Sequence, residues 1–179
     1  MRIALLLLGV VAFLNVRGQE AAASGSKPSV SDAAHLGIGG GLDHGGLGIR
    51  LDLPFTRHLA GVVGAGYALV GPGWNAGVQY RFAPDSKVGM YATALYGYNG
   101  VIKVENASQF DDIYYGFSVG AGAEFRVTHS TNFFRLAVLV PFRNAQFWSD
   151  WSGLENSSLI EVKQGPLPVA FSIGYHFSL

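Results

Sequence analysis

The feature that most constrains the fold is an alternation of apolar residues with small or polar residues, which recurs in eight stretches of the chain. It is clear in residues 169–179, where Phe, Ile, Tyr, Phe and Leu alternate with Ala, Ser, Gly, His and Ser. Successive side chains of a β-strand point to opposite faces, so each stretch predicts a strand with one apolar and one polar wall. No segment from Ala34 onward shows helical periodicity, which predicts an all-β domain.

The predicted strands are long for a water-soluble protein. Most run for about nine to eleven residues, as a tilted membrane-crossing strand requires, whereas strands of ordinary globular proteins have a mode of about five or six. The eight stretches are residues 35–43, 47–53, 59–70, 74–82, 87–98, 113–127, 133–142 and 169–179.

The connections between these strands alternate in length. Short connections follow the second, fourth and sixth strands, at residues 54–58, 83–86 and 128–132. Longer ones follow the fifth and seventh strands, at residues 99–112 and 143–168. Outer-membrane barrels have short periplasmic turns and longer external loops, and an even number of strands places the N- and C-termini together on the periplasmic side.

Aromatic residues gather near the strand ends on the apolar faces, where a membrane barrel carries its interfacial girdles. They are Trp74, Tyr80, Phe82, Tyr96, Tyr98, Tyr115, Phe125, Tyr175 and Phe177.

Charged residues gather on the opposite, polar faces of the strands. A soluble lipocalin-like barrel would have the reverse arrangement, with its apolar face inward and its charges outward. The pattern therefore predicts an all-β fold, an eight-stranded antiparallel up-and-down transmembrane β-barrel. The residues expected to line its lumen are Arg50, Asp52, Arg81, Glu124, Arg126, Arg135 and His176.

The N-terminal residues read as an export signal. Residues 1–18 combine Arg2 with an apolar run of about twelve residues, too short to span a membrane as a helix, and predict a signal peptide. Residues 19–34 are rich in Ala and Ser, with a Gly, a Lys and a Pro, and predict a flexible leader before the barrel of residues 35–179. The chain contains no cysteine, which excludes disulfides and thiolate metal sites.

The end of the chain carries a short motif with the spacing polar-x-Gly-x-x-apolar-x-apolar, formed by Ser172, Gly174, Phe177 and Leu179. It resembles the C-terminal assembly signal of outer-membrane barrels, although that family most often ends in Phe. The whole barrel region resembles small eight-stranded barrels such as the OmpA transmembrane domain, OmpX and OmpW. The resemblance implies a Gram-negative outer-membrane protein that the barrel-assembly machinery inserts among the lipids of that membrane.

The luminal charges are expected to meet in the periplasmic half of the barrel. An eight-stranded barrel is just wide enough to be filled by side chains, and buried charges need partners. Four arginines against Asp52 and Glu124 leave an excess of two positive charges. The sequence favours a salt-bridged plug, with a narrow anion-preferring pore as the alternative. The other half is lined by Gly, Ala, Ser and Thr, which permits either a cavity or close approach of the walls.

The most fitting function is a structural or surface-interaction protein of the outer membrane, with a narrow channel for small solutes as the first alternative. The long last loop contributes Phe147, Trp148 and Trp151 as candidates for binding an extracellular ligand or protein, or for folding onto the barrel rim. The zero net charge does not suggest a nucleic-acid partner.

A lipid-modifying outer-membrane enzyme is the less favoured alternative. Its candidates are Asp43 and His44 in the first external turn, with Ser149 or Ser152 in the last loop. No spacing ties these residues together, and an Asp-His pair in a turn is ordinary turn chemistry. We therefore predict no catalytic site, and the scattered histidines predict neither a metal site nor a cofactor.

Overall fold

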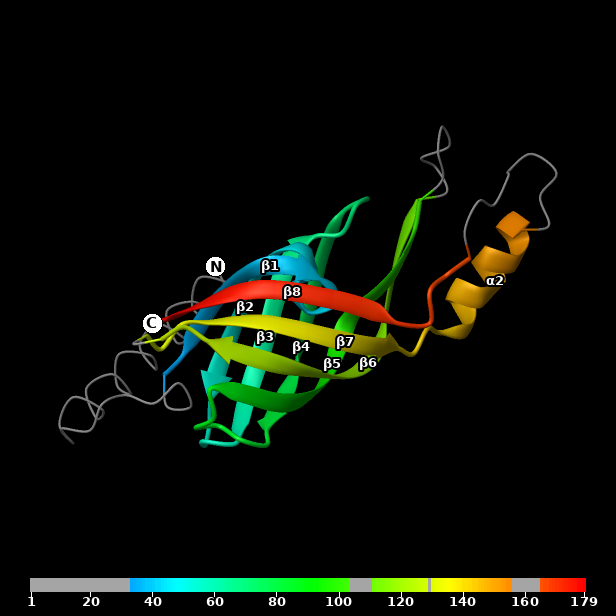
Figure 1. Cartoon of the computed structure of the whole chain (residues 1–179). Coiled ribbons are helices and arrows are strands. Elements are labelled where there is room, and N and C mark those ends of the chain that lie inside the picture. The colour runs from blue at the N-terminus through cyan, green and yellow to red at the C-terminus, as the bar shows by residue number, and fades with distance from the viewer. Residues whose placement is uncertain (1–32, 104–110, 129, 156–164) are drawn as a thin grey trace.

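The chain forms a closed barrel of eight antiparallel strands in which each strand pairs with its sequence neighbours and β8 pairs with β1 (Figure 1). The computed structural model describes residues 33–103, 111–128, 130–155 and 165–179, so the predicted signal peptide and most of the predicted leader lie outside the described residues. The predicted eight-stranded up-and-down barrel is confirmed. Its strands are β1 (His35–Gly41), β2 (Gly46–Pro54), β3 (Leu59–Tyr67), β4 (Pro72–Arg81), β5 (Val88–Ile102), β6 (Asp112–Arg126), β7 (Phe133–Pro141) and β8 (Ala170–Ser178).

The two ends of the barrel differ. At one end, called the terminal end below, β1 begins beside the end of β8, and the backbone N–H of Leu179 donates to the carbonyl of Ala34 at 2.9 Å. At the other end, the helix end, β5 and β6 extend as a hairpin of 15 residues each, and α2 (Ala145–Glu155) follows β7 (Figure 1). The expected loops at 99–112 and 143–168 therefore contain part of a strand and a helix, which local periodicity did not indicate.

The barrel wall is apolar outside and polar inside. Along β2, for example, the outward Ile49 is 50% exposed, whereas the neighbouring Arg50 is fully buried in the lumen. Along β8, the outward Phe171 is 67% exposed and the inward His176 is fully buried. This distribution is the inverse of that in a water-soluble barrel, where the apolar residues fill the interior.

The turn between β1 and β2 lies inside the barrel. It forms a short 3-10 helix, η1 (Leu42–His44), whose three residues are all buried and which contacts five of the strands besides β1. The sequence analysis placed Asp43 and His44 in an external turn, and that placement is wrong. The turn fits because glycines face it: a Cβ on Gly39 or Gly174 would lie 2.7 Å from Nε2 of His44.

Glycines also stand opposite the large inward side chains. Four inward glycines pair across the ladders with His176, Tyr91, Leu95 and Leu139. A Cβ on Gly122, for instance, would lie 2.6 Å from Cζ of Tyr91, and one on Gly120 would lie 2.8 Å from Cγ of Leu139. Each large side chain therefore fills the volume that its glycine neighbour leaves, which accounts for part of the unusually high content of 25 glycines. The four pairs are Gly37–His176, Gly122–Tyr91, Gly77–Leu95 and Gly120–Leu139.

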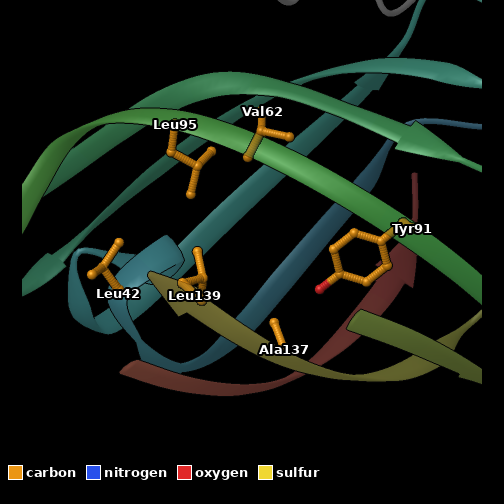
Figure 2. Close-up of a cluster of buried hydrophobic side chains, with 6 residues drawn as sticks. All are labelled: Leu42, Val62, Tyr91, Leu95, Ala137 and Leu139. Carbon is orange, nitrogen blue, oxygen red and sulfur yellow. The ribbon is translucent and has the colours of Figure 1, made fainter. Parts of the chain in front are cut away.

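An apolar layer crosses the lumen beside η1. Figure 2 shows Leu42 of η1 and Leu139 of β7 facing Leu95 and Val62 from the opposite wall, and each of these side chains is at most 5% exposed. The sequence permitted either a cavity or close approach of the walls in this half of the lumen. At this level the lumen is filled by packed side chains.

Replacing Gly64 should expel η1 from the lumen. A Cβ at Gly64 would collide with the backbone of Asp43 and lie 3.4 Å from Cα of His44. We predict that Gly64→Val lowers the free energy of unfolding by about 1–3 kcal/mol, the usual cost of overpacking. The measurement is urea-induced unfolding of the refolded protein. Gly40→Val is the control, because its Cβ would meet only the flexible side chain of Leu47 at 3.0 Å.

Candidate functional site

Six buried charges form a continuous chain through the lumen, with carboxylates and guanidinium groups alternating along it. All six side chains are at most 2% exposed. In order they are Asp43, Arg50, Asp52, Arg135, Glu124 and Arg81.

Asp52 is the centre of this ion-pair chain. Its Oδ1 accepts a hydrogen bond from Nε of Arg50 at 2.9 Å, and its Oδ2 lies 2.8 Å from Nη1 of Arg135. Nδ1 of His176 lies 3.3 Å from the same Oδ2, and the imidazole ring stacks on Phe133 with a centroid distance of 4.8 Å. Residues from β2, β7 and β8 thus converge on one carboxylate.

Glu124 and Gln79 carry the chain across the lumen to β4. Oε1 of Glu124 accepts from Nη2 of Arg135 at 2.5 Å, and its Oε2 lies 3.3 Å from Nε of Arg81. Gln79 bridges the two halves, because its amide accepts from Arg50 at 2.6 Å and donates to Glu124 at 2.8 Å. Buried ions of this kind stay charged only because each has oppositely charged and hydrogen-bonding partners.

The ion-pair chain is electrically neutral, with three arginines and three carboxylates. The sequence analysis counted an excess of two positive charges in the lumen, and two placements change that count. Asp43 enters the lumen with η1 and binds Arg50, while Arg126 remains half-buried at the terminal end without an ion pair among the described residues. The other six predicted luminal residues all lie in the buried cluster.

Sequence reasoning missed Asp43, Gln79 and Tyr91 as parts of this cluster. Tyr91 contributes its ring, which lies 4.9 Å from the guanidinium carbon of Arg135 in a cation–π contact. The excess of positive charge was itself the available signal for Asp43, because a buried surplus of that size requires a further carboxylate.

Polar contacts hold η1 against the wall of the lumen. The side-chain amide of Asn75 donates to the carbonyl of Leu42 at 2.5 Å and to that of Tyr98 at 3.1 Å. Nδ1 of His44 donates to Oδ1 of its neighbour Asp43 at 2.8 Å, since an ionised carboxylate can only accept. The Asp43–His44 pair, a catalytic candidate in the sequence, is therefore enclosed in the lumen and does not face the exterior.

The helix α2 packs on the hairpin extension of β5 and β6. Phe147 is 2% exposed and lies between Ile102 and Tyr114, whose hydroxyl donates to Asp150 at 2.8 Å. Arg143 stacks over Phe147 at 4.9 Å, and burial lowers the pKa of its guanidinium from the ordinary value.

The three loop residues proposed for binding have different surroundings. Phe147 is an internal anchor of α2, and Trp151 is half-buried against the same cluster. Trp148 is 48% exposed and remains the surface candidate among them.

The residues of the C-terminal motif divide between the two faces of β8. Ser172 and Gly174 face the lumen, where Gly174 makes room for His44. Phe177 and Leu179 lie on the outside and are exposed.

The described residues form no candidate metal site, and no known protein resembles the chain closely enough to suggest a site. Within residues 33–179, apart from the segments that the structure leaves out, no group of three or more His, Asp or Glu residues is arranged to hold a metal ion. None of the described helices is long and apolar enough to cross a membrane. In comparisons with known proteins, no family model, no curated protein and no solved structure matches this chain.

Neutralising the centre of the ion-pair chain should destabilise the barrel strongly. We predict that Asp52→Asn lowers the free energy of unfolding by about 3–5 kcal/mol, because it leaves two buried guanidinium groups without their shared partner. Asp85→Asn is the matched control, since Asp85 is 60% exposed and lies 3.8 Å from the equally exposed Arg57. Loss of such a surface pair costs about 0–1 kcal/mol. Equal urea midpoints for the two variants would contradict this ranking.

Removing the anchor of α2 should loosen the helix without opening the barrel. In Phe147→Ala, we expect the backbone amides of α2 to exchange with deuterium at least tenfold faster, while those of β7 and β8 keep their protection. Trp148→Ala should change both sets much less, because Trp148 is 48% exposed and touches the cluster through an edge contact with Phe147, at 5.3 Å between ring centroids. Unchanged exchange in the Phe147 variant would show that another contact holds α2.

Proposed function

We propose that the protein is an integral outer-membrane β-barrel of a Gram-negative bacterium, with a structural or surface-interaction role. The observation that carries this proposal is the inverted wall, apolar outside and charged inside. Burying one large aliphatic or aromatic side chain contributes about 1.5–3 kcal/mol, and a lipid bilayer buries all the outward side chains together. Water would leave Ile49, Phe171 and their outward neighbours exposed.

Two aromatic clusters on the outer surface support membrane insertion. Toward the helix end, Tyr96 contacts Trp74 at 6.3 Å and Phe117 at 5.0 Å between ring centroids. Toward the terminal end, Tyr175 contacts Phe134 at 4.6 Å and Phe177 at 4.8 Å. Aromatic residues at both levels are typical of the two membrane–water interfaces of a barrel.

The orientation follows from the two ends. The terminal end carries the short turns, so we assign it to the periplasm, and we assign the β5–β6 hairpin and α2 to the cell exterior. The motif of Ser172, Gly174, Phe177 and Leu179 resembles an assembly signal and supports the barrel-assembly machinery as a partner during insertion.

The lumen favours a structural role over a channel or an enzyme. The ion-pair chain and the apolar layer that contains Leu42 and Leu139 fill successive levels of the barrel. The Asp43–His44 pair lies inside this packed lumen, at a distance from any lipid substrate on the outer surface. The exposed Trp148 on the anchored helix α2 supports surface interaction with an extracellular protein or ligand, since exposed aromatic residues are enriched at interfaces.

Reconstitution into planar lipid bilayers tests the closed lumen. We expect the protein to float with lipid vesicles in a density gradient, which shows insertion, and to give no steady conductance at neutral pH in bilayers formed from the same preparation. A large, reproducible, anion-selective current step would contradict the closed lumen and favour the narrow channel. Failure to float with vesicles would contradict the membrane assignment itself.

A further inference from the structure

The neutral ion-pair chain leaves one positive charge unmatched at the terminal end. Arg126 ends β6, and its backbone N–H donates to the carbonyl of Lys87 at 3.1 Å. Its guanidinium is attracted by Glu124 and by the exposed Asp85, and it is repelled by Arg81, the last member of the chain. Glu124 already binds both Arg135 and Arg81, and Asp85 is an exposed carboxylate that pairs with Arg57. Among the buried carboxylates at this end of the lumen, Glu124 therefore faces three guanidinium groups.

Four guanidinium nitrogens of this pair have no hydrogen-bond partner among the residues that the structure describes. They are Nη1 and Nη2 of Arg81 and Nε and Nη2 of Arg126. Arg81 is 1% exposed, so its unpaired N–H groups carry a desolvation cost of about 1–3 kcal/mol, and more for a charged group. Buried donors of this kind call for an acceptor, and a buried excess of positive charge calls for an anion.

One strand presents only a glycine beside Glu124, the shared partner of these arginines. Gly89 of β5 pairs with Glu124 and carries no side chain there, and a Cβ at this position would make only ordinary contacts, at 3.6 Å from Oε2 of Glu124. Arg126 is half-buried at the barrel mouth, and no ion pair in the described part of the chain fixes the position of its guanidinium group. Because Arg126 is half-buried, part of its side chain is accessible from the aqueous side.

We propose that Arg81 and Arg126 form a phosphate-binding site at the terminal mouth of the barrel. A planar guanidinium group presents paired N–H donors that match two oxygens of a phosphate, and two such groups match its charge near neutral pH. A single carboxylate would satisfy only one of the two forks. The ligand is free inorganic phosphate or a small soluble phosphate ester, because Arg81 lies within the lumen and a lipid headgroup on the outer surface does not reach it. The site depends on the barrel fold alone and goes beyond the proposed structural role.

The test is a calorimetric titration of inorganic phosphate into the full chain, refolded in micelles of an uncharged detergent at low ionic strength. We expect saturable binding of one phosphate per barrel. Arg126→Gln should weaken it at least tenfold. Gly89→Val should also weaken it, because the added side chain would crowd the space beside Glu124 while it keeps every charge. Arg57→Gln is the control: it removes one exposed positive charge at the same end and should change the affinity less than twofold. Circular dichroism and urea midpoints of the four proteins establish that all are folded.

Several results would overturn the proposal. They are the absence of saturable binding in the folded wild-type protein, equal weakening by Arg57→Gln and Arg126→Gln, or tighter binding of succinate than of phosphate. A second arm uses vesicles of phosphatidylcholine with and without phosphatidylglycerol. An unchanged phosphate affinity supports a soluble ligand, whereas weaker binding in the anionic vesicles shows that headgroup phosphates compete for the site and overturns the soluble source. None of these outcomes bears on insertion into the membrane, which the flotation assay tests separately.

Discussion

The structure depends on the buried ion-pair chain that crosses the lumen from Asp43 to Arg81. Four strands of the barrel, β2, β4, β6 and β7, and the turn η1 meet in this chain. The chain therefore connects strands such as β2 and β7 that do not pair with each other in the sheet. A buried charge in this chain is stable only while its partner is present, because an unpaired charge would bear the full cost of desolvation. The network therefore favours one arrangement of the strands over others. With the charges buried inside, the exposed outer wall carries the apolar side chains, and an apolar surrounding would bury them. The two requirements together favour a membrane over water.

Glycine is the second part of this design. A lumen of eight strands has little width, and large inward side chains fit only where the neighbouring strand contributes almost no volume. The pairs of Gly37 with His176 and of Gly122 with Tyr91 show this relation across two separate ladders. The same rule admits a whole turn of the backbone, because Gly39, Gly64 and Gly174 face η1. The glycines that would weaken a strand in isolation thus permit the packing that closes the lumen.

The number, order and facing of the strands followed from the sequence because a two-residue period states directly which side chain points inward. Arg50, Arg81 and Glu124 were assigned to the lumen in this way, and the structure places them there. The inward position of η1 could not be predicted from the sequence, because Asp43-His44-Gly45-Gly46 is also typical of an external turn. Only the glycines of distant strands make the inward position possible. The helix α2 was hidden for a similar reason. Phe147, Trp151 and Leu154 stand at helical spacing in α2, but this short pattern lies in a stretch that the sequence analysis assigned to the long last loop. The contact of Phe147 with the extended hairpin is a tertiary one.

The most direct measurement of the central claim compares the two adjacent valines of β3. Val62 is 1% exposed and points into the lumen, whereas Val63 is 49% exposed on the outer wall. With methyl-labelled protein in phospholipid nanodiscs, a nitroxide on the lipid acyl chains should broaden the methyl resonances of Val63 strongly and those of Val62 weakly. A water-soluble nitroxide should broaden neither. Strong broadening of Val63 by the water-soluble probe, with no effect of the lipid probe, would contradict the account, because the apolar wall would then face water.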